Sequence, residues 1–140
     1  MNITSLYIYP SFWTVAIVRQ YPNALFVFGD NDCGKGTGGQ AIIRNEPNSI
    51  GLPTKKMPRN TKHSFYTDKE YADNCLKIDI AIQSILKVAL QKKYTTIVLP
   101  ANGFGTGLSQ LQNKAPHTLA YIEQKIECLK GFFPIVHELP

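Results

Sequence analysis

Glycines gather in two short stretches of the chain, and each stretch follows an apolar run. The first stretch holds four glycines within six residues: Gly34, Gly36, Gly38 and Gly39. Helix-compatible residues, Gln40 to Arg44, come directly after them. A strand, a glycine-rich loop and a helix in this order gather backbone N–H groups and the positive end of a helix dipole at one spot, which favours anions and above all phosphate. The first stretch is therefore a candidate phosphate-binding loop.

The spacing of these glycines matches neither the dinucleotide fingerprint nor the phosphate loop of nucleotide hydrolases, because no Lys-Ser or Lys-Thr pair closes the loop. Glycines also serve tight turns and close helix packing, and that reading stays open. A second stretch of the same kind, Asn102-Gly103-Phe104-Gly105-Thr106-Gly107, favours a ligand because two such loops can grip one molecule.

Other polar residues lie beside these loops. Thr54 and Lys55 follow another expected strand end and could reach a phosphate, or the lysine could simply be solvated. Cys33 lies near the expected helix start, where the pKa of a thiol can be lowered, but no histidine that could act as its base is near in sequence. His117 lies close behind the second loop and points either at the site or into solvent.

Apolar runs and turn residues predict the elements that position these loops. We expect strands at residues 5–9, 25–28, 49–53, 95–99 and 132–137. Residues 11–20 fit a helix capped by Ser11 or, because of their β-branched residues, a strand. A capping box from Thr67 to Glu70 introduces a long helix with apolar residues at helical spacing from Tyr71 to Leu90. A last helix starts at Pro116 and ends before Gly131.

Strands and helices alternate, and the strands are short and almost continuously apolar. This pattern predicts a three-layer α/β/α fold with a mostly parallel or mixed sheet and helices on both faces. Ligands of such sheets bind outside the carboxyl ends of the strands. Both glycine loops leave carboxyl ends of strands, one after Phe28 and one after Leu99, so the two loops are expected on one edge of the sheet.

The motifs around the two glycine stretches resemble those of a known family. The run F-V-F-G-D-N, followed by G-x-G-G-Q-A, R-x-x-P-N and G-L-P-T-K, is similar to small phage and bacterial proteins related to the macro domain, the ADP-ribose-binding module. The resemblance covers Leu25 to Lys55 strongly and Ile97 to Leu108 moderately. It implies a macro-domain-like fold and an ADP-ribose-type nucleotide or related phosphate ligand.

By this resemblance the two glycine stretches would approach a diphosphate from opposite sides. Asn31 would face the distal ribose, Asp30 would meet an amino group or a hydroxyl, and Phe104 would pack on a ribose or base. Hydrolysis of an ADP-ribosyl bond would need a water molecule held near the distal ribose by Asn31, Asp30 or Asp32, and Asp30 and Asn31 are the candidate catalytic residues. The expected ligand-binding residues are Gly29, Asp32, Gly34, Gly36, Gly38, Gly39, Gln40, Thr54, Lys55, Asn102, Gly103, Phe104, Gly105, Thr106 and Gly107.

The composition is that of one soluble domain over residues 1–140, with 44% hydrophobic and 18% charged residues. No segment resembles a signal peptide or a membrane span, and we expect a cytoplasmic protein. Three scattered cysteines predict neither a disulfide framework nor a metal site, and Cys75 and Cys128 are expected in the core. No metal and no cofactor are expected, since the histidines lack metal-ligand spacing.

Three classes of function remain. The first is binding of an ADP-ribose-type nucleotide, with or without hydrolysis. The second is a non-catalytic binding or interaction protein, such as a phage accessory protein that acts on a host partner. The third is a nucleic-acid-binding module using the basic loop at residues 55–63, which the net charge of +5 allows. That loop lacks interleaved aromatic residues and any nucleic-acid motif, so nucleic acid is the least favoured partner.

Overall fold

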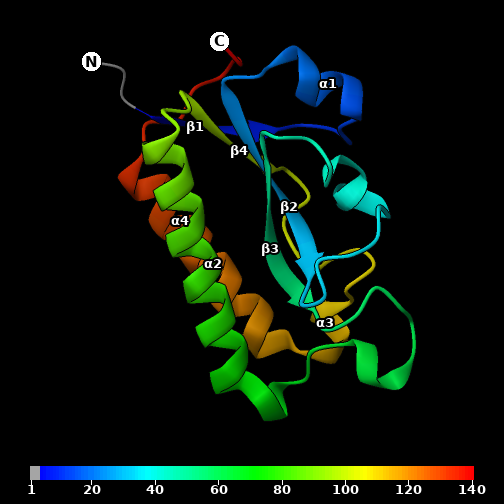
Figure 1. The fold of residues 1–140 in the computed structure, drawn as a ribbon. Helices are drawn as coiled ribbons and strands as arrows, with labels where there is room; N and C mark the ends of the chain where they lie inside the picture. The colour runs from blue at the N-terminus through cyan, green and yellow to red at the C-terminus, as the bar shows by residue number, and fades with distance from the viewer. Residues whose placement is uncertain (1–3) are drawn as a thin grey trace.

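The computed structural model describes residues 4–140 and is built around a four-stranded sheet with helices on both faces (Figure 1). The strand order is β1-β4-β2-β3, and all three pairs of neighbouring strands are parallel. The strands are β1 (Ser5–Tyr9), β2 (Ala24–Asn31), β3 (Ser49–Lys55) and β4 (Thr96–Pro100). The expected α/β class is therefore confirmed, and the sheet is parallel throughout.

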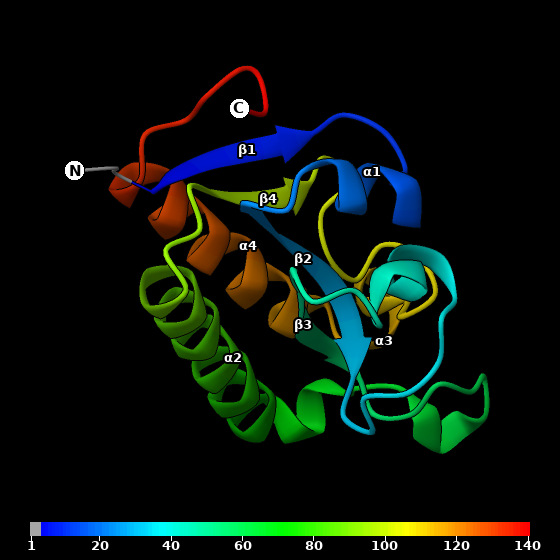
Figure 2. The same cartoon turned by 45° about the horizontal axis from the view of Figure 1, so that its top comes forward.

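Two layers of helix sandwich this sheet. The long helices α2 (Tyr71–Gln91) and α4 (Pro116–Phe132) cover one face, and α1 (Val15–Gln20) with the 3-10 helix η1 (Gly39–Ile43) covers the other (Figures 1 and 2). Side chains of β2 alternate between the two layers: Leu25 and Val27 join the core under α2 and α4, whereas Phe26 and Phe28 pack with Trp13 on the other face. Because both faces are buried, the strand reads as a continuous apolar run.

The short elements complete the chain. They are η2 (Lys62–Ser64), η3 (Asp68–Glu70) and α3 (Leu111–Lys114). Of the two structures considered for residues 11–20, the helix forms. It begins at Val15, four residues after the predicted cap residue Ser11. Thr14 is the N-cap residue, and its side chain accepts a hydrogen bond from the Ile17 amide at 3.2 Å.

The predicted capping box at Thr67 does not form. The chain makes η3 first, and the Thr67 hydroxyl donates to the Glu70 carboxylate at 3.4 Å rather than accepting from a backbone amide. Glu70 is drawn away because its carboxylate also pairs with the Lys56 ammonium. Asp68 of η3 instead accepts from the amides of His117 and Thr118 at 2.9 and 3.1 Å, so it caps the first turn of α4 from a neighbouring element.

The predicted strand at residues 132–137 was wrong. Helix α4 continues through Gly131 to Phe132, and the chain beyond makes only an isolated bridge between Leu6 and Ile135. Leu6 donates to the Pro134 carbonyl, and Val136 donates to the Leu6 carbonyl, at 2.8 and 2.9 Å. Two hydrogen bonds hold this segment against the edge of β1 without a ladder.

The placement of Cys75 and Cys128 in the core was also wrong. Cys75 is half-buried and Cys128 is exposed on α4. Helical spacing shows which residues share a face but does not define the width of the buried stripe. Of the apolar residues predicted to share one face of α2, only Ile78, Ile85 and Ala89 are fully buried, and Leu90 is exposed. Within residues 4–140, none of the helices combines the length and the hydropathy that a membrane-spanning segment requires.

Candidate functional site

A cavity of about 970 Å³ lies at the carboxyl ends of β2, β3 and β4, bounded by both glycine loops. The parallel sheet brings all three strand ends to one edge, which is where ligands of such folds bind. Most residues that the sequence nominated line its wall. They are Gly29, Asp30, Asn31, Gly36, Gly38, Gly39, Gln40, Thr54, Lys55, Asn102, Gly105, Thr106 and Gly107.

Four nominated residues lie outside this lining: Asp32, Gly34, Gly103 and Phe104. The Asp32 carboxylate accepts from the Tyr66 hydroxyl at 2.5 Å and pairs with the Lys77 ammonium at 2.7 Å. Phe104 is buried in the core under α2 and α4, so it does not offer its ring to this cavity. Gly34 and Gly103 both have positive φ and turn the chain within their loops.

The cavity also has lining residues that the sequence did not nominate. Lys35 and Thr37 lie inside the first glycine loop, and Leu108 and Ser109 continue the second, so proximity to the glycines was a signal for them. Pro58 and Asn60 come from the basic loop after β3. Phe12 comes from the connection between β1 and α1, and nothing in its sequence context indicated a site.

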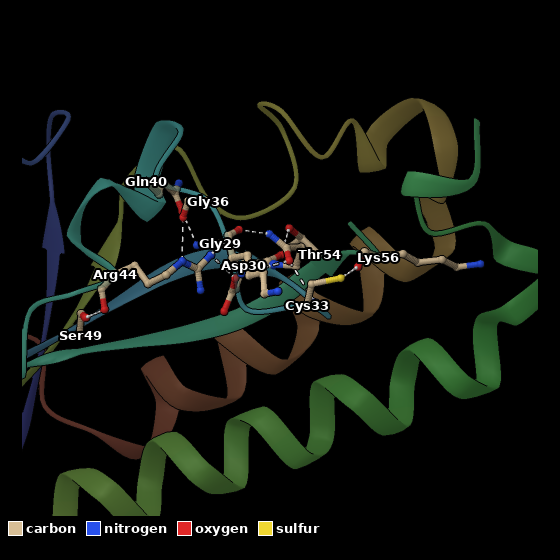
Figure 3. Close-up of polar contacts among 11 residues, drawn as sticks. Gly29, Asp30, Cys33, Gly36, Gln40, Arg44, Ser49, Thr54 and Lys56 are labelled. Carbon is tan, nitrogen blue, oxygen red and sulfur yellow. Dashed lines mark hydrogen bonds and ion pairs between the residues drawn. The ribbon is translucent and has the colours of Figure 1, made fainter. Parts of the chain in front are cut away.

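Asp30 and Asn31 belong to β2 rather than to a loop, because the strand runs past Phe28. The Asp30 carboxylate forms an ion pair with Arg44 at 2.5 Å and accepts from the Asn31 amide at 2.7 Å (Figure 3). Arg44 also donates to the carbonyls of Gly36 and Lys35, at 2.7 and 3.1 Å. The pair thus ties the end of β2 to the first glycine loop.

Asn31 organises the same loop from within. Its side-chain oxygen accepts from the amides of Cys33 and Lys35, at 3.0 and 3.5 Å, and its side-chain nitrogen donates to the Lys35 carbonyl at 2.7 Å. This is the self-bonded turn that asparagine commonly makes. Cys33 itself is exposed, and its thiol lies 3.4 Å from the Lys56 carbonyl, outside the cavity lining (Figure 3).

Gln40 connects the two glycine loops. Its side-chain oxygen accepts from the Gly29 amide at 2.8 Å, and its side-chain nitrogen donates to the Gly103 carbonyl at 2.9 Å. Its own carbonyl accepts from the Trp13 indole at 3.0 Å. The element that carries Gln40 is a five-residue 3-10 helix, so the expected α-helical dipole behind the first loop is absent.

The backbone of both loops nevertheless offers hydrogen-bond donors. Within residues 4–140, no protein acceptor takes a hydrogen bond from the amides of six lining residues: Gly36, Thr37, Gly38, Gly105, Thr106 and Gly107. Five of these residues are exposed and Gly105 is buried. Because backbone N–H groups seldom stay unpaired when they are buried, the amides are available to water or to a ligand. Two sets of available donors therefore border one cavity.

Lys55 adds a positive charge to the wall. The residue is only 8% exposed, and its ammonium lies 4.8 Å from the centre of the Phe65 ring and 3.5 Å from the Asn60 side-chain oxygen. No carboxylate of the described residues lies within salt-bridge distance of it. Burial lowers the pKa of this lysine. A buried ammonium without a carboxylate partner suits an anionic ligand.

Two further polar residues, Asn48 and His117, lie outside the cavity and contact other parts of the protein. The Asn48 side-chain nitrogen lies 3.0 Å from each of the carbonyl oxygens of Val18, Tyr21 and Ala24, and its hydrogen bonds to them tie the start of β3 to the end of α1 and to β2. His117 is outside the cavity lining and packs edge-on to Tyr71. Among residues 4–140 no group of three His, Cys, Asp or Glu side chains could hold a metal ion.

Comparison with known proteins identifies the family of this chain but does not indicate an activity. No curated protein and no solved structure matches the chain. One family model matches residues 8–125, a span that contains all four strands except the first residues of β1, both glycine loops and the cavity. The chain therefore belongs to this family, which is described as a family of unknown function, DUF7831.

Proposed function

We propose that the cavity binds an ADP-ribose-type nucleotide or a related phosphate ligand, with the phosphates between the two glycine loops. One observation carries this proposal. Six backbone amides from two loops that lack a protein acceptor, and the Lys55 ammonium, which has no carboxylate partner among residues 4–140, belong to residues that line the same cavity. Backbone donors and a lysine are the groups that proteins use for phosphate. The macro-domain resemblance supports the same ligand class.

The size and charge of the cavity support a nucleotide-sized anion. Its volume of about 970 Å³ lies at the upper end of the range of small-molecule pockets. The charged lining residues are Lys35, Lys55 and Asp30, and the carboxylate of Asp30 is already neutralised by Arg44. Its wall therefore carries a net positive charge.

Binding is better supported than hydrolysis. Asp30 and Asn31, the residues nominated for catalysis, both line the cavity, but the hydrogen bonds described above commit their side chains to Arg44 and to the first loop. A general base must have an oxygen free to take a proton from water. Both contacts of Asp30 end on Oδ1, and its other carboxylate oxygen, Oδ2, lies beside Gly51 of β3. We therefore propose a binding protein, and we treat cleavage of an ADP-ribosyl bond as a separate activity to be measured.

Calorimetry and thermal unfolding with ADP-ribose, ADP, AMP, NAD and inorganic pyrophosphate test this proposal. A ligand that binds only the folded state at 100 times its Kd adds about 2.7 kcal/mol to the free energy of unfolding. The informative variant is Gly38→Val. Gly38 has a negative φ of −79°, and its added Cβ would meet only the end of the exposed Leu108 side chain, at 3.3 Å. The fold should accept it, while the valine should block a phosphate from the loop.

Gly131→Val is the matched control, because Gly131 lies near the end of α4, outside the cavity lining, with no atom within 4 Å of an added Cβ. We expect ADP-ribose to stabilise the wild type and Gly131→Val equally and Gly38→Val much less. If none of the five compounds binds the wild type, the proposed function is wrong. Equal binding by Gly38→Val would exclude the first loop as the phosphate site.

A further inference from the structure

We propose that Phe12 and Leu108 form an apolar subsite of the cavity, where a planar base stacks without hydrogen-bond recognition of its identity. This inference rests on the proposed nucleotide function and assigns the part of the ligand that the glycine loops do not bind. It replaces Phe104, the aromatic residue nominated from the sequence, whose ring is buried in the core.

Phe12 is the most exposed large apolar side chain of the described residues, at 84%, and it lines the cavity. An exposed phenyl ring has no packing role in the fold. A base offers such a ring a π-face, and stacking removes apolar area of both partners from water. A ligand with a flat aromatic group therefore fits this position better than a bare phosphate.

The backbone around Phe12 is held in place. The neighbouring Trp13 is buried, packs edge-on against Phe26 with 5.6 Å between ring centres, and donates to the Gln40 carbonyl at 3.0 Å. This connection lies on the same side of the sheet as η1 (Figure 2). Phe12 is thus presented on a fixed segment that is tied to the first glycine loop, so little ordering is needed when a ligand binds.

Leu108 supplies the second apolar surface from the other loop. It is 60% exposed, lines the same cavity, and its Cδ1 lies beside Gly38 and Gly39. Phe12 and Leu108 are the two strongly exposed large apolar residues of this lining, and they come from connections about 100 residues apart in the chain. The fold brings both side chains to the lining of one cavity, which also contains the glycine-loop residues proposed to bind phosphate.

The charges of the lining argue against recognition of one particular base. A carboxylate reads the exocyclic amino group of adenine, guanine or cytosine. Among residues 4–140 the one carboxylate of this lining is Asp30, whose Oδ1 accepts from Arg44 and the Asn31 amide and whose Oδ2 lies beside Gly51. The side-chain amides of Asn31 and Gln40 are likewise committed. Stacking on Phe12 adds no selection of its own, because every base has a π-face.

Isothermal titration calorimetry of the full chain with ADP, GDP, CDP, UDP and inorganic pyrophosphate tests the subsite. For the wild type we expect ADP and GDP affinities within about threefold of each other and weaker binding of the pyrimidine nucleotides. Phe12→Ala should weaken ADP binding by about 5- to 150-fold, the range for loss of one stacked base. It should leave pyrophosphate binding unchanged, and Phe12→Trp should restore ADP binding.

Phe132→Ala is the matched control, because Phe132 is 81% exposed at the end of α4 and outside the cavity lining. The inference is overturned if Phe12→Ala binds ADP as tightly as the wild type, if it loses pyrophosphate in parallel, or if one purine is preferred more than tenfold. In each of these cases the nucleotide still binds, so the proposed function stands. Absence of binding by ADP and pyrophosphate alike would overturn both.

Discussion

Gln40 and Gly103 are joined by a hydrogen bond of 2.9 Å from the glutamine side chain to the glycine carbonyl, across 63 residues of sequence. The bond fixes the second glycine loop to the helix that follows the first, and the same side chain accepts from the Gly29 amide. The two walls of the cavity are therefore held at a set distance before any ligand arrives. Preorganisation of this kind reduces the entropy lost on binding.

Gln40→Ala should therefore weaken ligand binding more than it weakens the fold. Two hydrogen bonds of about 1 kcal/mol each are lost, and solvent can replace part of them because the site is partly exposed. Gln40→Glu keeps the acceptor for Gly29 but places a negative charge beside the Gly103 carbonyl. Urea unfolding and ADP calorimetry on both variants would check this. Unchanged affinity in both would show that the loops hold their spacing without Gln40.

Asp30→Ala should reduce stability by about 3 kcal/mol, because it leaves the guanidinium of Arg44 largely buried without its partner. The double variant Asp30→Asn with Arg44→Gln removes both charges and should recover part of the loss. Urea unfolding of the single and double variants measures the coupling. A stable Asp30→Ala protein that binds ADP-ribose but loses hydrolysis would instead support the catalytic role considered for Asp30.

Lys55→Met should leave stability unchanged or raise it by about 1 kcal/mol, since methionine fills similar space without a buried charge. The same change should weaken pyrophosphate binding about 10- to 100-fold, because a charge-assisted hydrogen bond is lost. Lys87→Met is the control, on an exposed lysine of α2. Thermal unfolding and calorimetry separate the two effects.

The stability difference between wild type and Lys55→Met should also depend on pH. Burial lowers the folded-state pKa of Lys55 below its usual 10.5, so the cost of the charged form is full below that lowered pKa. As pH rises from the folded pKa towards 10.5, the native state sheds its proton first and the wild type gains relative to the variant. A constant difference across this range would contradict the burial of the ammonium.

Asp68→Asn should destabilise the protein by about 1 kcal/mol at pH 7, as for loss of a helix cap. Burial acts to raise the pKa of Asp68, but the hydrogen bonds from the His117 amide and from Thr118 outweigh it and lower the pKa. The stabilisation is therefore complete above about pH 4 and is lost as pH falls through the lower folded value. Urea unfolding between pH 2 and pH 7 should show a smaller acid loss in Asp68→Asn.

Local sequence pattern predicted the four strands and the two long helices in their order along the chain, but not the end of the chain after α4. The apolar runs before Pro10, Gly29 and Pro100, and the helical spacing after Pro116, identify their elements because burial on both faces of a sheet, or on one face of a helix, imposes a period on the sequence. The shared position of the two glycine loops followed as well, since the carboxyl ends of parallel strands meet at one edge whatever the strand order.

The inward or outward direction of individual loop side chains was decided by the tertiary structure. Gly103 and Gly105 have φ of 75° and 84°, and the turn between them sends Phe104 into the core, while Leu108 stays at the cavity. Asp32 is turned towards Tyr66 and Lys77, which lie 34 and 45 residues further along the chain. No local pattern records such partners.

Phe12 is a second example of a side-chain position that only the tertiary structure decided. As a sequence, Phe12 and Trp13 are two adjacent aromatic residues in an ambiguous segment. The structure buries one against Phe26 and leaves the other exposed at the cavity, because the sheet offers an apolar surface to only one of them. Sequence periodicity thus determined the framework of this protein, and long-range packing decided which side chains reach its site.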